Sequence, residues 1–550
     1  MNQNIRSFLT SPQGLFSFFV LLSVALKLFV IDVGAPYIMM DDANMFSGGF
    51  LVWFGQAPPQ RMYIESWFSG LSSMTVYITS QLLSGNASAL NLNIVAEAYA
   101  DFNQNPYPYV TGYRYLMLLF DMLTVLFVFK TAQIVFATKQ NGQWFAALAA
   151  SLYLMSYNTL WCNVVSRPDT GAALFASAGL YLYYKSKFGN IQTTLWCSAL
   201  LMGLSTGYKL HCALFVVFIL FDMWRVLGFK TAFKRCFQFG LISFVAFLVA
   251  SGSAIFDPLL YAKLRALNVK DDASPWIEWG DQVAVVFNGT GWLALPLLIG
   301  AMVPAWKNRN NPEYKAITSI VFLATFWVIL FLSIRQLRAY WMLPALPLIY
   351  MAAVSVFTTV KSRAIIVGVS VIALSIVSFQ TIKQAYDLKQ VKYNELSEWI
   401  ETNVDSESAI YIYGYEALNL PKNTQAINNM RKGIERKINN TLASEKFTYR
   451  HIRNWEERAT LKLYSMLEFQ SKGYEYYGYY VAPLDEFKGI LSLDDMDYVI
   501  FLEGFMFPEI QEVKRVLEYE FKEVASVVGP GGGSKGLRYQ VYKRKSFNAQ

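Results

Sequence analysis

The stretch YRYLMLLFDMLTVLFVF, residues 113–129, decides the fold class of this chain. It carries only two charged residues, Arg114 at its start and Asp121 near its middle, and the apolar character continues to about residue 136. A helix needs about 20 predominantly apolar residues to cross the hydrocarbon core of a bilayer. We therefore predict a membrane-spanning helix over residues 112–136.

The whole chain shares this character. Its 550 residues are 54% hydrophobic and 16% charged, with a mean hydropathy of +0.29, which is unusual for a soluble protein of this size. The 16% aromatic content suits a chain with many interfacial Tyr and Trp residues. Eleven segments are apolar enough to span: 14–33, 112–136, 143–162, 168–184, 191–208, 211–228, 237–256, 288–306, 316–334, 339–358 and 364–381. The prediction is an α-helical polytopic membrane protein.

The orientation follows from Lys and Arg in the short connections, because positive residues are retained on the cytoplasmic side. With the N-terminus inside, the cytoplasmic set is Arg6, Lys130, Lys139, Lys185, Lys187, Arg225, Lys230, Lys234, Arg235, Lys307, Arg309, Lys315, Lys361 and Arg363. The opposite connections hold only Arg167, Lys209, Arg335 and Arg338. We therefore predict a cytoplasmic N-terminus, a retained first helix, and an external first loop over residues 34–111.

Several protein classes are excluded by composition. The net charge of +8 comes from cations scattered over short loops, which is not the single basic face of a nucleic-acid-binding protein. The four cysteines, Cys162, Cys197, Cys212 and Cys236, all fall in the apolar part and indicate no disulfide framework. Two histidines without a Cys-x-x-Cys pair leave no zinc signature.

After about residue 385 the pattern changes to alternating helical and strand-like segments. Strands are predicted over 409–413, 474–481, 497–503, 521–529 and 539–544. The run GPGGGSKG at 529–536 lacks the spacing of a phosphate-binding loop and joins two strand-like runs, so we interpret it as a strand connection. We predict a membrane module over residues 1–384, which includes the first external loop, and an extracytoplasmic α/β domain over residues 385–550.

The predicted outer side collects an unusual set of charged residues. Asp41 and Asp42 follow the first helix, Arg114 enters the second, and the remaining members lie in later connections: Arg167, Asp169, Lys209, Arg335 and Arg338. Ionisable residues at membrane depth are costly and indicate function by default. A carboxylate suits the removal of a proton from an acceptor, and fixed positive charge suits a departing phosphate. The combination favours transfer of a sugar from a lipid phosphate.

At these residues the chain resembles the GT-C polytopic glycosyltransferases, in particular bacterial relatives of protein O-mannosyltransferases and of the transferase that adds aminoarabinose to lipid A. The resembling stretches are DDA (41–43), the stretch at 113–129, SRPDTGAALFASAGLYLYY (166–184), GLSTGYKLHCALF (203–215) and RAYWMLPALPLIYMAA (338–353). They follow the family's order along most of the chain. The aromatic residue expected soon after the acids is displaced to Phe46, and no fingerprint selects a subgroup, so the sugar and the acceptor stay open.

The resemblance implies a role for each site residue. Asp41 is the expected general base, Asp42 orients the acceptor, and the reaction inverts the anomeric carbon. A polyprenyl-phosphate-linked sugar is the expected donor, and the acceptor is a lipid, a glycan or a protein. The donor phosphate would contact Arg114, Arg167, Lys209, Arg335 and Arg338, and the substrate would contact Asp169 and Tyr340. No metal or other cofactor is expected, although an acid pair is also a ligand set for a divalent cation. The expected location is the inner (plasma) membrane, with the C-terminal domain periplasmic or extracellular.

Structural roles are alternatives to catalysis and substrate binding for several of these residues. Asp41 or Asp42 could cap a surface helix, and Asp169 could cap the helix after Pro168. Lys209, like Lys27 in the first helix, could extend its ammonium to the interface. For the whole chain the alternatives are a polytopic transporter or lipid flippase, and a non-catalytic envelope assembly protein. A transporter would favour two similar halves with broken helices at the midplane, and no such repeat is evident.

Overall fold

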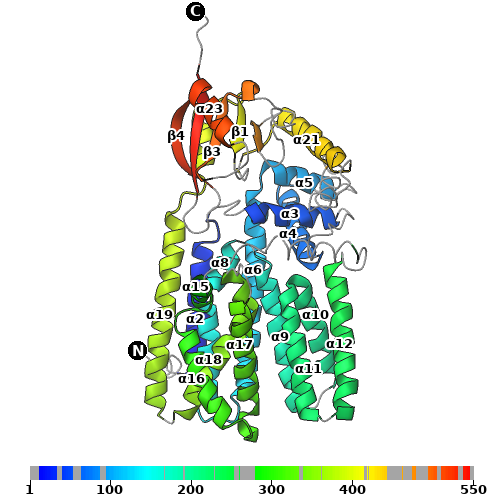
Figure 1. The fold of residues 1–550 in the computed structure, drawn as a ribbon, viewed down its shortest axis with the longest axis vertical. Coiled ribbons are helices and arrows are strands. Elements are labelled where there is room, and N and C mark those ends of the chain that lie inside the picture. Colours follow the sequence, from blue (N-terminus) through cyan, green and yellow to red (C-terminus); the bar gives the residue numbers. More distant parts are fainter. Residues whose placement is uncertain are drawn as a thin grey trace, which may run out of the picture. The chain divides into compact units, whose positions relative to one another are not determined.

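The architecture was analysed in a computed structural model of the chain (Figure 1). The structure describes residues 11–33, 40–53, 63–86, 94–165, 167–189, 192–227, 229–252, 259, 279–333, 339–360, 362–413, 418, 420–442, 461, 473–478, 493–504, 510–529 and 537–545. The chain forms two compact units. The helical unit contains residues 1–31, 62–65 and 114–386, and the mixed unit contains residues 32–61, 66–113 and 387–550.

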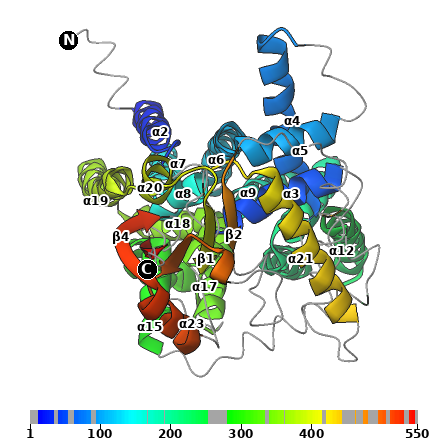
Figure 2. The same cartoon turned by 90° about the horizontal axis from the view of Figure 1, so that it is seen from above.

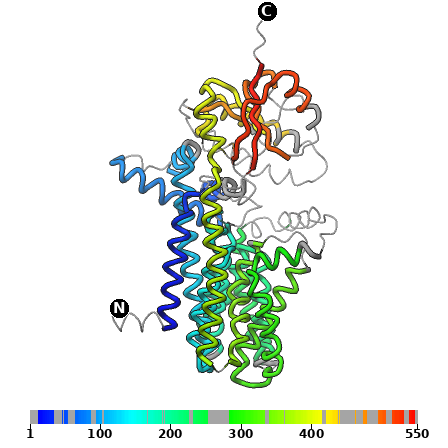
Figure 3. The backbone as a smooth tube through the Cα atoms, turned by 90° about the vertical axis from the view of Figure 1, so that its left-hand side faces the viewer, coloured from blue at the N-terminus to red at the C-terminus, as the bar shows by residue number. Residues whose placement is uncertain are grey.

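The long helices of the helical unit run along a common direction (Figure 3), except at the break between residues 282–290 and 294–307, where two helices meet at 87°. They are α2 (Pro12–Phe29), α6 (Tyr107–Val135), α7 (Gly142–Leu154), α8 (Tyr157–Val164), α9 (Asp169–Gly189), α10 (Gln192–Tyr208), α11 (Ala213–Leu227), α12 (Phe229–Ser251), α15 (Trp279–Thr290), α16 (Ala294–Lys307), α17 (Lys315–Ser333), α18 (Leu346–Val354) and α19 (Arg363–Gln390). Short 3₁₀ segments are η2 (Leu210–Cys212), η3 (Pro312–Tyr314), η4 (Ala339–Ala345) and η5 (Ser355–Thr359). Helical structure therefore occurs over all eleven predicted segments, which confirms the helical fold class.

Six described helices are long and apolar enough to cross a membrane: Pro12–Phe29, Tyr107–Val135, Thr231–Ser251, Pro312–Leu332, Trp341–Thr359 and Arg363–Asn403. A seventh span results if Gln282–Thr290 and Ala294–Lys307, which meet at an angle of 87°, are counted as one. The total of eleven crossings stays a prediction.

Two of the predicted spans are interrupted. The segment 143–162 divides into α7 and α8, and the hydroxyl of Thr159 donates to the carbonyls of Leu154 and Ser156 at 3.0 and 2.8 Å. The segment 288–306 divides at Gly291, whose φ of +79° favours glycine. There the hydroxyl of Tyr350 donates to the carbonyl of Thr290 at 2.8 Å. Breaks in apolar surroundings persist where side chains satisfy the released backbone groups, as these do.

Small residues let α10 and α12 pack closely. A Cβ on Gly203 would lie 2.2 Å from the carbonyl oxygen of Ser243, and one on Gly207 would lie 2.2 Å from the Cβ of Ala250. The hydroxyl of Ser243 donates to the carbonyl of Ala199 at 2.9 Å. Helix association in apolar surroundings depends on such close approach and on interhelical hydrogen bonds. These contacts fix the position of the C-terminal half of α10.

Buried ion pairs join other helices of this unit. Lys27 on α2 pairs with Asp121 on α6, and both side chains are about 1% exposed. The predicted extension of Lys27 to the interface is therefore wrong: its ammonium is more stable beside a buried carboxylate of the neighbouring helix than unpaired. Elsewhere Asp222 on α11 accepts from Tyr183 and pairs with Lys187 of α9 at 2.5 Å. These pairs tie helices that are distant in sequence.

The mixed unit begins with helices from the predicted first loop, α3 (Met40–Trp53), α4 (Tyr63–Leu83) and α5 (Ile94–Gln104). An aromatic cluster holds α3 in place. Phe46 lies 5.6 Å from the ring centroids of both Phe102 and Tyr113, and Phe50 lies 5.2 Å from that of Tyr99. Phe46 and Phe50 are fully buried. The displaced aromatic after the acid pair is therefore a core residue of this unit.

The C-terminal part of the mixed unit contains a five-stranded sheet of order β2-β1-β3-β5-β4. The strands are β1 (Ala409–Tyr413), β2 (Glu475–Gly478), β3 (Tyr498–Leu502), β4 (Phe521–Gly529) and β5 (Leu537–Arg544). β1 is parallel to β2 and β3, whereas β5 is antiparallel to β3 and β4. All five predicted strands are confirmed, and the glycine-rich run joins the antiparallel pair β4 and β5, as expected for a strand connection.

The period-two pattern of the strands produces two cores. Tyr411 and Phe501 lie on one face with residues of α21 (Thr424–Leu442) and α23 (Ile510–Glu520). Ile410 and Ile500 lie on the other face with residues of α20 (Glu395–Asn403). Figure 2 shows α21 next to β2. Strands covered by helices on both faces confirm the α/β class of this domain.

Candidate functional site

A buried ion pair lies where α9 begins and α10 ends. The carboxylate of Asp169, the first residue of α9, is 3.3 Å from the ammonium of Lys209, the residue after α10. Asp169 is fully buried, and the side chain of Lys209 is 17% exposed. An ammonium has three N–H donors, so one contact with Asp169 leaves it able to bind a second anion. Two residues that the sequence predicted for the site are therefore brought together.

Tight packing of α9 against α10 explains why these two residues meet. Gly171 lies in the first turn of α9, two residues after Asp169, and a Cβ there would be 2.5 Å from the ring of Tyr208. The hydroxyl of Ser205 donates to the carbonyl of Ala172 at 2.9 Å. Lys209 follows directly in an extended conformation, with φ −144° and ψ 115°, which ends the helix beside Asp169.

Arg167 belongs to the same cluster. It precedes α9, its side chain is buried, and its backbone N–H donates to the carbonyl of Cys162 at 3.0 Å. Arg167 is two residues before Asp169, and its backbone contact with Cys162 places it between the end of α8 and the start of α9. With two cations and one carboxylate, the cluster carries a net charge of +1. A mostly buried site of that charge favours an anionic ligand.

Asn158 on α8 forms hydrogen bonds with two other segments of the chain, the end of α15 and the start of η4. Its side-chain amide donates to the carbonyls of Gly289 and Ala339 at 2.7 and 2.9 Å. Ala339 begins η4 and follows Arg338, so Asn158 positions the backbone next to that predicted residue. Asn158 was not among the site residues predicted from the sequence. An amide inside the apolar run 143–162 was the available signal, because polar residues in such runs commonly form interhelical hydrogen bonds.

Arg114 makes a different kind of contact. Its guanidinium is fully buried and donates to the carbonyl of Ile31 at 2.8 Å, just beyond the C-terminal end of α2. Cations stabilise helix C-termini, where carbonyls lack helical partners. Its own carbonyl accepts from Asn163 at 3.4 Å. This geometry supports a structural contribution from Arg114, and its contact with a donor phosphate stays a prediction.

Asp41 and Asp42 lie in the first turn of α3, within the mixed unit. Acidic residues at a helix N-terminus interact favourably with the helix dipole. The position is therefore compatible with helix stabilisation, and the assignment of these residues to catalysis stays a proposal.

Three predicted residues lie beyond what the structure describes. Arg335 and Arg338 are outside the described residues, and so is the side chain of Tyr340, whose backbone belongs to η4. The ring centroid of His211 lies 5.9 Å from that of Trp327 and 6.0 Å from that of Phe331, so His211 is a packed residue. Within the described ranges, no group of three or more His, Cys, Asp or Glu residues is placed to hold a metal ion.

No protein-family model and no curated protein matches the chain. The crystal structure of ArnT from Cupriavidus metallidurans bound to undecaprenyl phosphate matches with a TM-score of 0.53 at 10% sequence identity, covering 98% of this chain and 99% of that chain. The chain therefore shares the fold of this ArnT structure. A structure of the same ArnT in the apo state matches with a TM-score of 0.48 at 12% identity, covering 96% of this chain and 97% of that one.

Proposed function

We propose that this protein is a membrane glycosyltransferase that moves a sugar from a polyprenyl-phosphate donor to an acceptor outside the cytoplasm. The observation that carries the proposal is the buried, net-positive cluster of Arg167, Asp169 and Lys209 at helix ends of a GT-C fold. The ArnT structure of that fold was solved with undecaprenyl phosphate bound. The acceptor and the sugar stay open.

The cluster suits a phosphate that leaves as an anion. Arg167 offers a planar set of donors for two phosphate oxygens, and Lys209 offers a compact charge. Asp169 would act as a positioning residue, because its carboxylate holds the ammonium of Lys209 at the end of α10. Fixed donors that require no rearrangement stabilise the charge that develops on the leaving phosphate.

The second requirement is a base. We propose that Asp41 removes the proton from the acceptor hydroxyl or amine while that atom attacks the anomeric carbon from the side opposite the phosphate. The C–O bond to the phosphate breaks with its electron pair, so polyprenyl phosphate leaves and the anomeric configuration inverts. Asp42 would orient the acceptor, and Arg335, Arg338 and Tyr340 would contact the donor.

The test is release of polyprenyl phosphate from a labelled lipid-linked sugar donor by the purified full chain. Asp41→Asn should abolish release while the protein stays folded and inserted. Asp32→Asn is the matched control, because Asp32 pairs with Lys389 at 2.8 Å near the surface, where such a pair contributes little. Full activity of Asp41→Asn would refute the assignment.

The donor contacts are tested separately. Arg338→Ala should raise the apparent KM for the donor more than that for the acceptor, and Arg309→Ala, in an exposed connection, should change neither. Movement of intact glycolipid across a vesicle membrane without release of polyprenyl phosphate would instead support a transporter or flippase. Complementation of a deletion by a variant with both Asp41 and Asp42 changed to Asn would support a non-catalytic assembly protein.

A further inference from the structure

A second candidate site lies at the opposite end of the helical unit. A pocket of about 510 Å³ is formed by the C-terminal end of α6, the C-terminal half of α9 and the start of α17 with η3. From Arg114 to Ile134 on α6 is 20 residues, or about 30 Å at 1.5 Å per residue, which matches the thickness of a bilayer core. From Asp169 to Lys185 on α9 is about 24 Å by the same measure. The pocket is therefore separated from the cluster around Asp169 by most of a membrane thickness.

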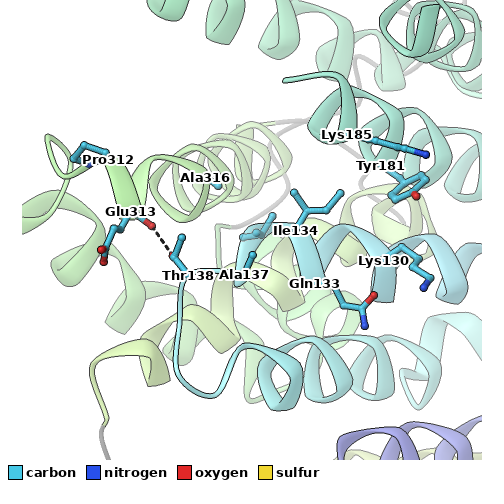
Figure 4. A pocket seen from close by; sticks show the side chains of 11 residues that line it. Lys130, Gln133, Ile134, Ala137, Thr138, Tyr181, Lys185, Pro312, Glu313 and Ala316 are labelled. Atoms are coloured by element: carbon cyan, nitrogen blue, oxygen red, sulfur yellow. Dashed lines mark hydrogen bonds between the residues drawn. The ribbon is translucent and has the colours of Figure 1, made fainter. Parts of the chain in front are cut away.

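The pocket combines cations with an apolar wall. Lys130 of α6 and Lys185 of α9 line one side, and Figure 4 shows them there together with Tyr181. Both lysines are exposed, and neither forms an ion pair with any residue that the structure describes. Ile134, Ala137 and Ala316 supply apolar surface between them and η3.

The single acid of the pocket is already neutralised. Glu313 lies on the side away from the two lysines (Figure 4), and its carboxylate is 3.6 Å from the ammonium of Lys139. Its carbonyl accepts from the hydroxyl of Thr138 at 3.2 Å, and Lys139 also lies 3.5 Å above the ring of Tyr314. Lys130 and Lys185 therefore line the pocket rim without a carboxylate partner among the described residues, and the ammonium of Lys185 lies 5.8 Å from the ring of Tyr181.

We propose that this pocket binds an anionic phospholipid from the leaflet at that end of the helices. The phosphate would lie between Lys130 and Lys185, and an acyl chain would cover Ile134, Ala137 and Ala316. The predicted orientation makes this the cytoplasmic leaflet, where anionic lipids attract Lys and Arg near the membrane surface. A small free anion would use the lysines but would leave the apolar wall uncovered, which favours the lipid as occupant.

The test is native mass spectrometry of the full chain from micelles that contain equal amounts of phosphatidylglycerol and phosphatidylcholine. The wild-type protein should retain phosphatidylglycerol preferentially. Lys130→Gln with Lys185→Gln should weaken that binding about 30-fold, equivalent to about 1 kcal/mol per lysine. The matched control, Lys234→Gln with Arg235→Gln, removes the same charge from α12 and should bind as the wild-type protein does.

A second variant tests the apolar wall without changing charge. Ala137→Phe places a bulky side chain at the pocket wall and should also reduce retention of phosphatidylglycerol, so the proposal stays testable if the lysine variant folds poorly. Release of polyprenyl phosphate should persist in both variants, which separates this site from the proposed function. Equal retention of the two lipids, an equal loss in the α12 control, or displacement of the lipid by inorganic phosphate would overturn the proposal.

Discussion

The ion pair between Asp169 and Lys209 supports an asymmetric prediction about stability. At 3.3 Å the attraction between the two charges is about 5 kcal/mol with an effective dielectric constant of about 20. Removing two ions from water costs several kcal/mol for each ion, so the pair as a whole contributes little net stability. The contribution becomes visible only when one partner is removed.

Asp169 is more deeply buried than Lys209, so replacing either one should lower the free energy of unfolding by a different amount. Lys209→Met leaves a fully buried carboxylate without its partner and should lower the free energy of unfolding by about 3–5 kcal/mol. Asp169→Asn leaves a lysine that is 17% exposed and can extend its ammonium to water, so the loss should be about 1–2 kcal/mol. The double variant Asp169→Asn with Lys209→Met should lie within about 1 kcal/mol of the wild-type protein.

Reversible unfolding in mixed detergent micelles, followed by circular dichroism, measures all four corners of this double-mutant cycle. Equal losses in the single variants, or a double variant whose loss is the sum of the two, would refute the reasoning. Donor-dependent release of polyprenyl phosphate adds a second readout. If the cluster binds phosphate, the stable double variant should still lose most of that activity.

Three further predictions rest on other contacts. Gly171→Ala should cost about 1–3 kcal/mol, because its Cβ would lie 2.5 Å from the ring of Tyr208, and Gly368→Ala, with no atom within 4 Å, should be neutral or stabilising by thermal unfolding. Asn158→Leu should lower the free energy of unfolding by about 2–4 kcal/mol, because the carbonyls of Gly289 and Ala339 lose the amide that donates to them. Turnover of the lipid-linked sugar should also fall, because η4 is no longer held in position by Asn158. Burial and the hydrogen bond to Glu475 raise the pKa of the Tyr477 hydroxyl, so its contribution to stability is present below pH about 10 and is lost as the pH rises above it. In Tyr477→Phe the free energy of unfolding, measured by denaturation at a series of pH values, should therefore fall less between about pH 10 and higher pH than in the wild-type protein. A fall as large as that of the exposed control Tyr519→Phe would contradict this.

The sequence by itself determined the helical class and the α/β domain. Apolar runs of about 20 residues leave few alternatives to helices, since backbone groups in hydrocarbon must be satisfied within the segment. The alternation of strand residues such as Ile410 and Tyr411 placed the strands correctly, because period two assigns each residue to one face of the sheet.

The tertiary structure decided which charges meet. Lys27 and Lys209 look alike in sequence, each a single lysine at an apolar segment, yet Lys27 is buried with Asp121 and Lys209 is part of the Asp169 cluster. Asp169 and Lys209 are 40 residues apart, and only the close packing at Gly171 brings them within 3.3 Å. Local sequence patterns indicate secondary-structure propensity and which segments lie in the membrane, whereas ion pairs depend on which helices lie side by side. That choice depends on small residues and interhelical hydrogen bonds distributed over the whole bundle.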